Sequence, residues 1–247
     1  MALPGPLQFK VFRAYEHFEA LSAEVQRYFK SEPAKLVGKH DPATNQPAVF
    51  LETVKPIPGR IAHIIGDMVQ NLRSSLDYLV WELVIAAKNS PGKDNMFPIC
   101  TTPGSFNRQL ARGRLRGVAP AAAAVIQALQ PYHLGEEAKT AALFMLDELC
   151  NINKHRHVPL INFGGGAVRG GVPTAVVDGV QYAILPPDLR ALTSITVGPG
   201  EVEVKCDVIA AIAFGEGAAE EMEISKALRS LLLYIRDEFM PHFEQFF

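Results

Sequence analysis

The hydrophobic pattern is clearest between Arg60 and Lys88, where apolar residues recur at the three- and four-residue spacing of an α-helix. At ~100° per residue these side chains fall on one narrow stripe, which we expect to face a core. The stripe consists of Ile61, Ile65, Met68, Leu72, Leu76, Leu79 and Leu83. Pro58 and Gly59 precede this pattern and Pro91 follows it, and such residues mark helix boundaries. The pattern therefore predicts a long central helix over about 60–88.

Polar residues occupy both flanks of this predicted helix, next to the apolar stripe. They are Asp67, Asn71, Arg73 and Asp77. Because apolar residues occur on nearly every side of the helix, we predict that these four side chains are partly buried. Buried polar groups need hydrogen-bond partners, so the sequence must supply them from another segment.

A second helical pattern, over 140–156, supplies candidate partners. It is apolar until its last turns, which contain Asn151, Asn153, Lys154, His155 and Arg156. Asn153 lies on the apolar face and is predicted to point inward. We predict that the two helices pack antiparallel, so that the polar end of one meets the polar flank of the other. Asp77 would then pair with Lys154 or Arg156, and Asn71 with Asn153 or with backbone.

Further helices are predicted over 9–29, 105–111, 120–129 and 220–240. Ser105 is the expected N-cap of the second of these, and Pro120 the first residue of the third. The first helix is amphipathic, and its spacing indicates one inward face. That face is predicted to contain Phe12, Tyr15, Phe18, Leu21, Val25 and Tyr28 or Phe29.

Short apolar or alternating runs predict strands rather than helices in two other parts of the chain. An N-terminal hairpin is predicted from strands over 34–39 and 48–54. In the second half, strands are predicted over 158–163, 174–177, 180–185, 195–197 and 202–214. Asp178-Gly179 is a two-residue turn signal between two of them.

We therefore predict an α+β fold: a helical bundle built round the central helix, with the N-terminal hairpin and a small antiparallel sheet. One domain over 1–247 is expected, with helical parts over about 9–156 and 218–247 and a strand-rich part over about 157–215.

Composition narrows the functional classes. The net charge of −2 excludes a protein that binds nucleic acid through an overall positive charge. The 48% of hydrophobic residues suffices for a sizeable core. The three cysteines show no C-x-x-C spacing, no signal-peptide core is visible, and no apolar run is long enough to span a bilayer. We therefore predict a cytoplasmic protein. One basic segment, with arginines at 108, 112, 114 and 116, reads as a solvated loop or as a phosphate-binding patch.

Motifs for specific chemistry are missing. The glycine-rich run over 164–171 is followed by no helix and fits neither phosphate-binding signature, and no nucleophile motif is visible. His63 and Asp67, four residues apart, could form a metal site with Asp147 and His155, but no H-x-x-x-H or E-x-x-H pair supports this. We expect no cofactor and no metal.

The run GDMVQNLRSSLDYLVWEL, followed by FPI, QPY and NINKHR, resembles a family of uncharacterised bacterial proteins. Their pattern is G-D-x-x-x-N-L-R-S-x-L-D and then N-x-x-K-H-R, and the resemblance covers most of the chain. It implies no particular activity. Family members often read R-S-A-L-D-H, which is similar to the R-x4–6-H signature of HEPN-type helical RNases. Tyr78 stands here at the position of that histidine, and a five-residue spacing places it roughly 140° round the helix from Arg73. Arg236 and His242 also match R-x5-H.

Two interpretations of the polar groups remain open. In the first they form a buried network that fixes the register of the helices, and the protein is a non-catalytic binding or scaffold module that self-associates. In the second they line a pocket, and the protein is a HEPN-like nucleotide-binding protein or RNase. His155 would then be the acid or base, with Lys154 and Arg156 holding an anion. A metalloenzyme is the third alternative.

Overall fold

The computed structural model describes residues 3–40, 47–53, 55–163, 174–177, 180–183 and 211–247. The fold is α+β, as predicted, and consists of a helical bundle together with short paired strands. The chain divides into two compact units, one made of residues 1–24, 59–159 and 214–247, the other of residues 25–58 and 160–213. None of the described helices is long and apolar enough to cross a membrane.

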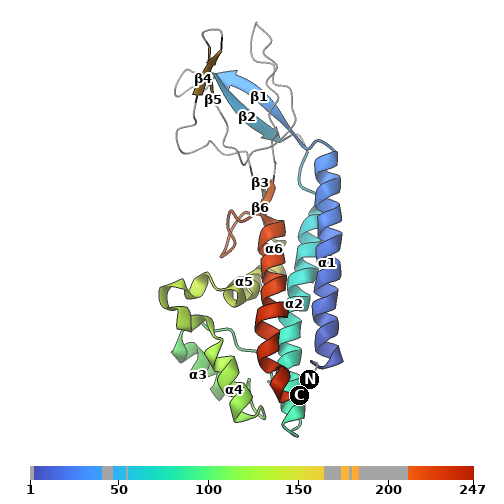
Figure 1. Cartoon of the computed structure of the whole chain (residues 1–247), viewed down its shortest axis with the longest axis vertical. Coiled ribbons are helices and arrows are strands. Elements are labelled where there is room, and N and C mark those ends of the chain that lie inside the picture. The colour runs from blue at the N-terminus through green and yellow to red at the C-terminus, as the bar shows by residue number, and fades with distance from the viewer. Residues whose placement is uncertain (1–2, 41–46, 54, 164–173, 178–179, 184–210) are drawn as a thin grey trace. The chain divides into compact units, whose positions relative to one another are not determined.

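The first unit is built round α2 (Gly59–Ala86), the predicted central helix. All seven residues of its predicted stripe are at most 1% exposed, so the stripe is confirmed as a core face. α5 (Ala142–His155) packs against α2, also as predicted. The first turns of α1 (Gly5–Lys30) and the C-terminal helix α6 (Ile224–Leu233) run alongside α2 (Figure 1).

The predicted inward face of α1 is wrong in its N-terminal half, while Leu21 and Tyr28 are buried as predicted. Its buried apolar residues are five, of which four are spaced seven residues apart and the fifth, Val11, lies between the first two. They are Leu7, Val11, Ala14, Leu21 and Tyr28. Phe12 and Tyr15, predicted to be inside, are 56% and 42% exposed. The helix begins four residues earlier than predicted, and its fully buried Ala14 suits close helix contact where an aromatic ring would not fit.

The C-terminal helix starts later than predicted and changes form along its length. The carboxylate of Glu223 caps α6 by accepting hydrogen bonds from the N–H groups of Ser225 and Lys226. The helix then continues as a π-helical turn, η2 (Tyr234–Phe239), and a 3₁₀ segment, η3 (Met240–Phe246). The side chain of Phe243 in this last segment is fully buried, which ties the C-terminus to the bundle.

Three short helices lie between α2 and α5: α3 (Pro103–Ala111), α4 (Pro120–Ala128) and the 3₁₀ segment η1 (Pro131–Lys139). Pro120 begins α4, as predicted. The predicted cap of α3 is wrong, because the hydroxyl of Thr102 accepts the hydrogen bond of the Ser105 N–H. A Pro at the first position of a helix favours a cap one residue before it, and Pro103 occupies that position.

The second unit contains the strand pairs. β1 (Ala34–His40) and β2 (Pro47–Thr53) form the predicted antiparallel hairpin, and β4 (Thr174–Val177) pairs antiparallel with β5 (Val180–Ala183). β3 (Leu160–Phe163) pairs with β6 (Ala211–Phe214). The predicted Asp178-Gly179 turn, the strand over 195–197 and the first part of the strand over 202–214 lie outside the described residues.

Candidate functional site

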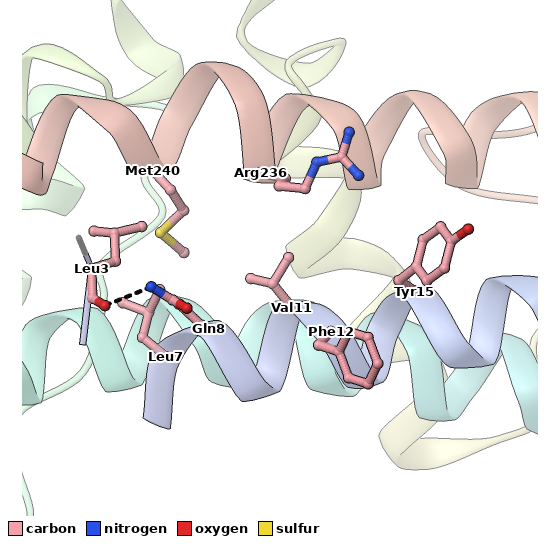
Figure 2. Close-up of a pocket in the computed structure, with 8 residues that line it drawn as sticks. All are labelled: Leu3, Leu7, Gln8, Val11, Phe12, Tyr15, Arg236 and Met240. Carbon is pink, nitrogen blue, oxygen red and sulfur yellow. Dashed lines mark hydrogen bonds between the residues drawn. The ribbon is translucent and has the colours of Figure 1, made fainter. Parts of the chain in front are cut away.

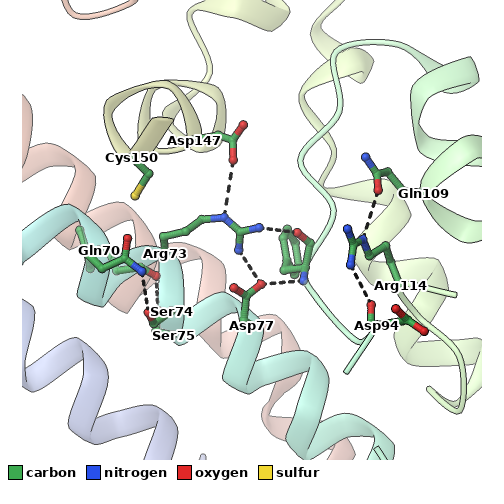
Figure 3. A network of polar contacts seen from close by, with 12 residues as sticks. Gln70, Arg73, Ser74, Ser75, Asp77, Asp94, Gln109, Arg114, Asp147 and Cys150 are labelled. Atoms are coloured by element: carbon green, nitrogen blue, oxygen red, sulfur yellow. Dashed lines mark hydrogen bonds and ion pairs between the residues drawn. The ribbon is translucent and has the colours of Figure 1, made fainter. Parts of the chain in front are cut away.

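The strongest polar cluster of the first unit is centred on Arg73, in the middle of α2. This residue is only 8% exposed. Its Nη1 donates to Oδ1 of Asp77 at 2.7 Å, and its Nη2 donates to the carbonyl oxygen of Phe97 at 2.8 Å. Its Nε lies 3.6 Å from Oδ1 of Asp147 (Figure 3). All three nitrogens of the guanidinium therefore face an acceptor, which is the arrangement that suits a buried arginine.

Asp77 completes this arrangement by holding the same loop residue from the other side. Its Oδ1 accepts the backbone N–H of Phe97 at 2.9 Å. The Arg73–Asp77 pair thus satisfies both peptide groups of Phe97, in the loop that leads from α2 to α3. The Phe97 ring is 1% exposed and packs edge-on against Phe239, with ring centroids 5.5 Å apart. The pair therefore fixes a loop whose aromatic side chain contributes to the core.

Asp147 extends the network onto α5. Its Oδ2 accepts a hydrogen bond from Nδ2 of Asn151 at 3.2 Å, and Nζ of Lys154 lies 3.5 Å from Oδ1 of Asn151. Asn151 and Lys154 are exposed, so this end of the network opens to solvent. The sequence pattern did not identify Asp147 or Phe97 as members. The spacing of four residues between Asp147 and Asn151 was the available signal for the first, and nothing local marks the second.

The predicted partners of Asp77 are wrong. Its carboxylate binds Arg73, one helical turn away on the same helix, rather than Lys154 or Arg156. Arg156 instead forms an ion pair with Glu216. A partner at the i,i+4 position needs no second helix to be in register, so the short-range pair forms in preference to the long-range one.

Asp67 and Asn71 lie outside the network. Asp67 is exposed, so its predicted burial is wrong. Nδ2 of Asn71 donates to the backbone oxygen of Asp67 at 2.8 Å, one of the two alternatives that the sequence left open, and not to Asn153. Both side chains lie on the flank of α2 that the apolar stripe does not reach.

Asn153 points inward, as predicted, and lies against Gly66 of α2. A Cβ atom placed on Gly66 would be 2.3 Å from Oδ1 of Asn153 and 2.7 Å from its Cγ. The glycine of the G-D-x-x-x-N motif therefore leaves space for Asn153, which stands at one of the x positions of the N-x-x-K-H-R motif. This contact gives a structural reason for both residues at the α2–α5 interface.

Gly66→Ala should lower the free energy of unfolding by about 1–2 kcal/mol, because overpacking at the Asn153 contact outweighs the ~1 kcal/mol by which Ala is favoured over Gly in a helix. Denaturant unfolding measures this change. Gly104→Ala in α3 is the matched control, since only Nη1 of Arg108 lies within 4 Å of its Cβ, at 3.7 Å. That control should be neutral or stabilising. Asn153→Ala should relieve most of the loss, and equal losses in both backgrounds would contradict the contact.

The predicted acid/base group does not form a closed site. His155, Lys154 and Arg156 are all exposed at the end of α5. Arg73, by contrast, is buried and engaged with other residues. His63, considered above as a metal ligand, stacks on His157, with ring centroids 4.7 Å apart. Among the described residues, no group of three or more His, Cys, Asp or Glu side chains is placed to hold a metal ion.

The basic segment between α3 and α4 is partly used by internal contacts. Arg114 donates from Nε to Oε1 of Gln109 and from Nη1 to the backbone oxygen of Asp94 (Figure 3). The other arginines of the segment, at 108, 112 and 116, are exposed. Exposed arginines fit both a solvated loop and a phosphate-binding patch, so both interpretations stay predictions.

Two buried cysteines border the network, and both carry free thiols. Sγ of Cys150 donates to the backbone oxygen of Val69 at 3.3 Å, which adds a link between α5 and α2. Burial raises the pKa of Cys150 to about 12, against the opposing effect of the nearby Arg73 charge. Burial also raises the pKa of Cys100. A thiol that stays protonated at neutral pH is a poor nucleophile, so neither cysteine suits covalent catalysis.

An apolar groove of about 420 Å³ lies between α1 and the C-terminal helix. Figure 2 shows Val11 and Tyr15 projecting from α1 toward Arg236 and Met240. Arg236 is exposed, and its guanidinium is bound side-on by the carboxylate of the adjacent Asp237. The sequence pattern does not indicate this groove, because the aromatic residues of α1 that line it are predicted to lie in the core.

Comparison with family models, curated proteins and solved structures finds no match to this chain. The resemblance to the bacterial family with the G-D-x-x-x-N-L-R-S pattern, and through it to HEPN-type proteins, stays a prediction. The functional roles of Lys154, His155 and Arg156 likewise stay predictions.

Proposed function

We propose that this protein is a non-catalytic helical binding or scaffold module that acts by associating with other polypeptide chains. The observation that carries the proposal is the state of Arg73. All three nitrogens of its guanidinium face protein acceptors, on Asp77, Phe97 and Asp147, and the residue is only 8% exposed, so a substrate phosphate has little access to it. We therefore interpret Arg73 and Asp77, the charged residues of the L-R-S-x-L-D run, as a structural clamp that joins α2 to the following loop and to α5.

Further support comes from the thiols and from the α1 surface. Cys100 and Cys150 are free and buried, in keeping with a reducing compartment, and we place the protein in the cytoplasm. Large apolar side chains on α1 are exposed where a monomer would favour polar residues. Exposed aromatic residues are the side chains that protein interfaces use most.

A HEPN-like RNase or nucleotide-binding protein is the alternative, and one observation favours it. Lys154, His155 and Arg156 are adjacent and exposed, so they could meet an anion without rearrangement of the core. His155 would supply the proton transfer, and the two cations the charge stabilisation.

The purified protein should show no metal-independent cleavage of a fluorescently labelled single-stranded RNA above the level of a buffer blank. His155→Ala and His242→Ala should both leave that baseline unchanged. Cleavage that His155→Ala abolishes, while His242→Ala does not, would make the RNase alternative correct. Cleavage that survives His155→Ala would instead favour the Arg236–His242 pair. Either result would overturn the non-catalytic proposal.

A further inference from the structure

The solvent face of α1 carries large apolar side chains that the first unit does not cover. Phe9 is 70% exposed and Phe12 is 56% exposed. Within residues 5–24, the part of α1 that belongs to the first unit, both lie within an arc of roughly 100° at ~100° per residue, together with four further positions whose side chains are exposed or half-buried. Those positions are Arg13, Glu16, Ala20 and Ala23. We refer to these six residues as the α1 face.

The α1 face is asymmetric along the helix in both size and charge. Its N-terminal half holds the two phenylalanines and the cation of Arg13, with Lys10 beside them. Its C-terminal half holds the anion of Glu16 and two alanines, with Glu19 beside them. Such a surface is complementary to itself when two copies run antiparallel, because each half then meets the opposite half of the other copy.

We propose that a second copy of this chain docks on the α1 face, with the two α1 helices antiparallel about a twofold axis that crosses this face at the level of residues 14 and 15. Arg13 of each copy then faces Glu16 of the other, and Phe9 faces Ala20. Large rings pack on small side chains, and opposite charges meet twice by symmetry. An isologous contact of this kind uses one patch on both subunits and closes as a dimer. The inference rests on the proposed function, since it names the partner of the binding module.

The charges of the α1 face favour a second copy over a membrane surface. Amphipathic helices that bind anionic lipid carry an excess of Lys and Arg beside their apolar residues. Over residues 5–24, the part of α1 in the first unit, Lys10 and Arg13 are balanced by Glu16 and Glu19, and Arg13 already pairs with Glu16 within the helix. The further cations of α1, Arg27 and Lys30, belong to the residues of the second unit. Because the positive and negative charges of residues 10–19 cancel, they give no net electrostatic attraction to an anionic bilayer. The same charges do stabilise an antiparallel pair of α1 helices, since the basic half of each helix then meets the acidic half of the other.

Mixing two charge-reversed variants tests both the partner and the orientation. Arg13→Glu and Glu16→Arg alter exposed side chains, so both variants should fold, which circular dichroism checks. Each variant alone places like charges opposite one another twice, and its dimerisation should weaken by at least about tenfold. An equimolar mixture should form a heterodimer again. Analytical ultracentrifugation, read against twice the 27.0 kDa chain mass, measures the wild type, the two variants and their mixture.

The mixture also distinguishes contacts between the two copies from the Arg13–Glu16 ion pair within one helix. Neither variant can form that internal pair, so recovery in the mixture must come from contacts between the copies. Phe12→Ala should weaken the dimer as well, and Leu134→Ala is the matched control. Leu134 is 54% exposed on η1, away from α1, and its removal should leave the dimer unchanged. A wild-type protein that stays monomeric, or a dimer that the charge reversals do not weaken, would overturn the inference. So would single variants that the mixture fails to rescue. The non-catalytic proposal would stand in each case, because the RNA assay tests it separately.

Discussion

Leu72→Ala should lower the free energy of unfolding by about 2–5 kcal/mol, one of the two largest losses that we expect from a single substitution. Leu72 has no solvent exposure and lies in the middle of the α2 stripe, on the helix against which α5 packs. Truncation removes buried methyl groups and leaves a cavity that two packed helices cannot easily close. Urea or guanidinium unfolding followed by circular dichroism measures the loss.

Leu110→Ala on α3 is the matched control for this prediction, since it makes the same chemical change at a side chain that is 40% exposed. Its effect should stay within about 0.5 kcal/mol. If Leu72→Ala also changes the unfolding free energy by no more than that, the apolar stripe of α2 does not form the core.

The central helix was predictable from the sequence because the apolar residues of α2 form a single stripe with uninterrupted helical spacing. Every predicted member of that stripe is buried, and the predicted ends differ from the observed ones by one or two residues. α1 could not be read in the same way, because apolar residues occur on more than one of its faces. Periodicity alone then favours the larger side chains, Phe12 and Tyr15, whereas packing selects the smaller Ala14.

The sequence predicted several residues of the polar network around Arg73, but not which of them contact one another. The pattern of α2 and α5 correctly marked Arg73, Asp77 and Asn151 as polar residues with internal partners. It could not show that Phe97, in a loop twenty residues beyond Asp77, supplies the peptide groups that both charged side chains bind. Loop conformation depends on tertiary contacts, and no periodic signal reports it.

The inward orientation of Asn153 was predictable because it interrupts an otherwise apolar helical face. Its contact was not predictable, because a glycine on the facing helix leaves no mark in the hydrophobic pattern. Gly66 is informative only once the close approach of Asn153 is seen. Gly66 and Asn153, which belong to separate segments of the sequence, then form one helix–helix contact, which supports a structural role for both residues.

Asp77→Ala should lower the free energy of unfolding by about 2–3 kcal/mol, because it leaves the buried Arg73 without its closest counterion and the Phe97 N–H without its acceptor. The side chain of Asp77 is 35% exposed, so the loss should fall below the ~3–5 kcal/mol of a fully buried pair. Chemical denaturation of the purified protein measures it, with Asp147→Ala as the control variant. Asp147 lies farther from Arg73, at 3.6 Å, and its removal should cost no more than about 1 kcal/mol.

A double-mutant cycle shows whether this loss belongs to the Arg73–Asp77 pair. Arg73→Met keeps much of the apolar volume of the arginine stem and removes the charge. In that background Asp77→Ala leaves no buried cation behind, so its cost should fall by at least about 1 kcal/mol, the coupling energy expected between contacting residues. Additive losses would mean that Arg73 does not depend on Asp77. The two side chains would then not act as one clamp, and the observation that carries the proposed function would lose its main contact.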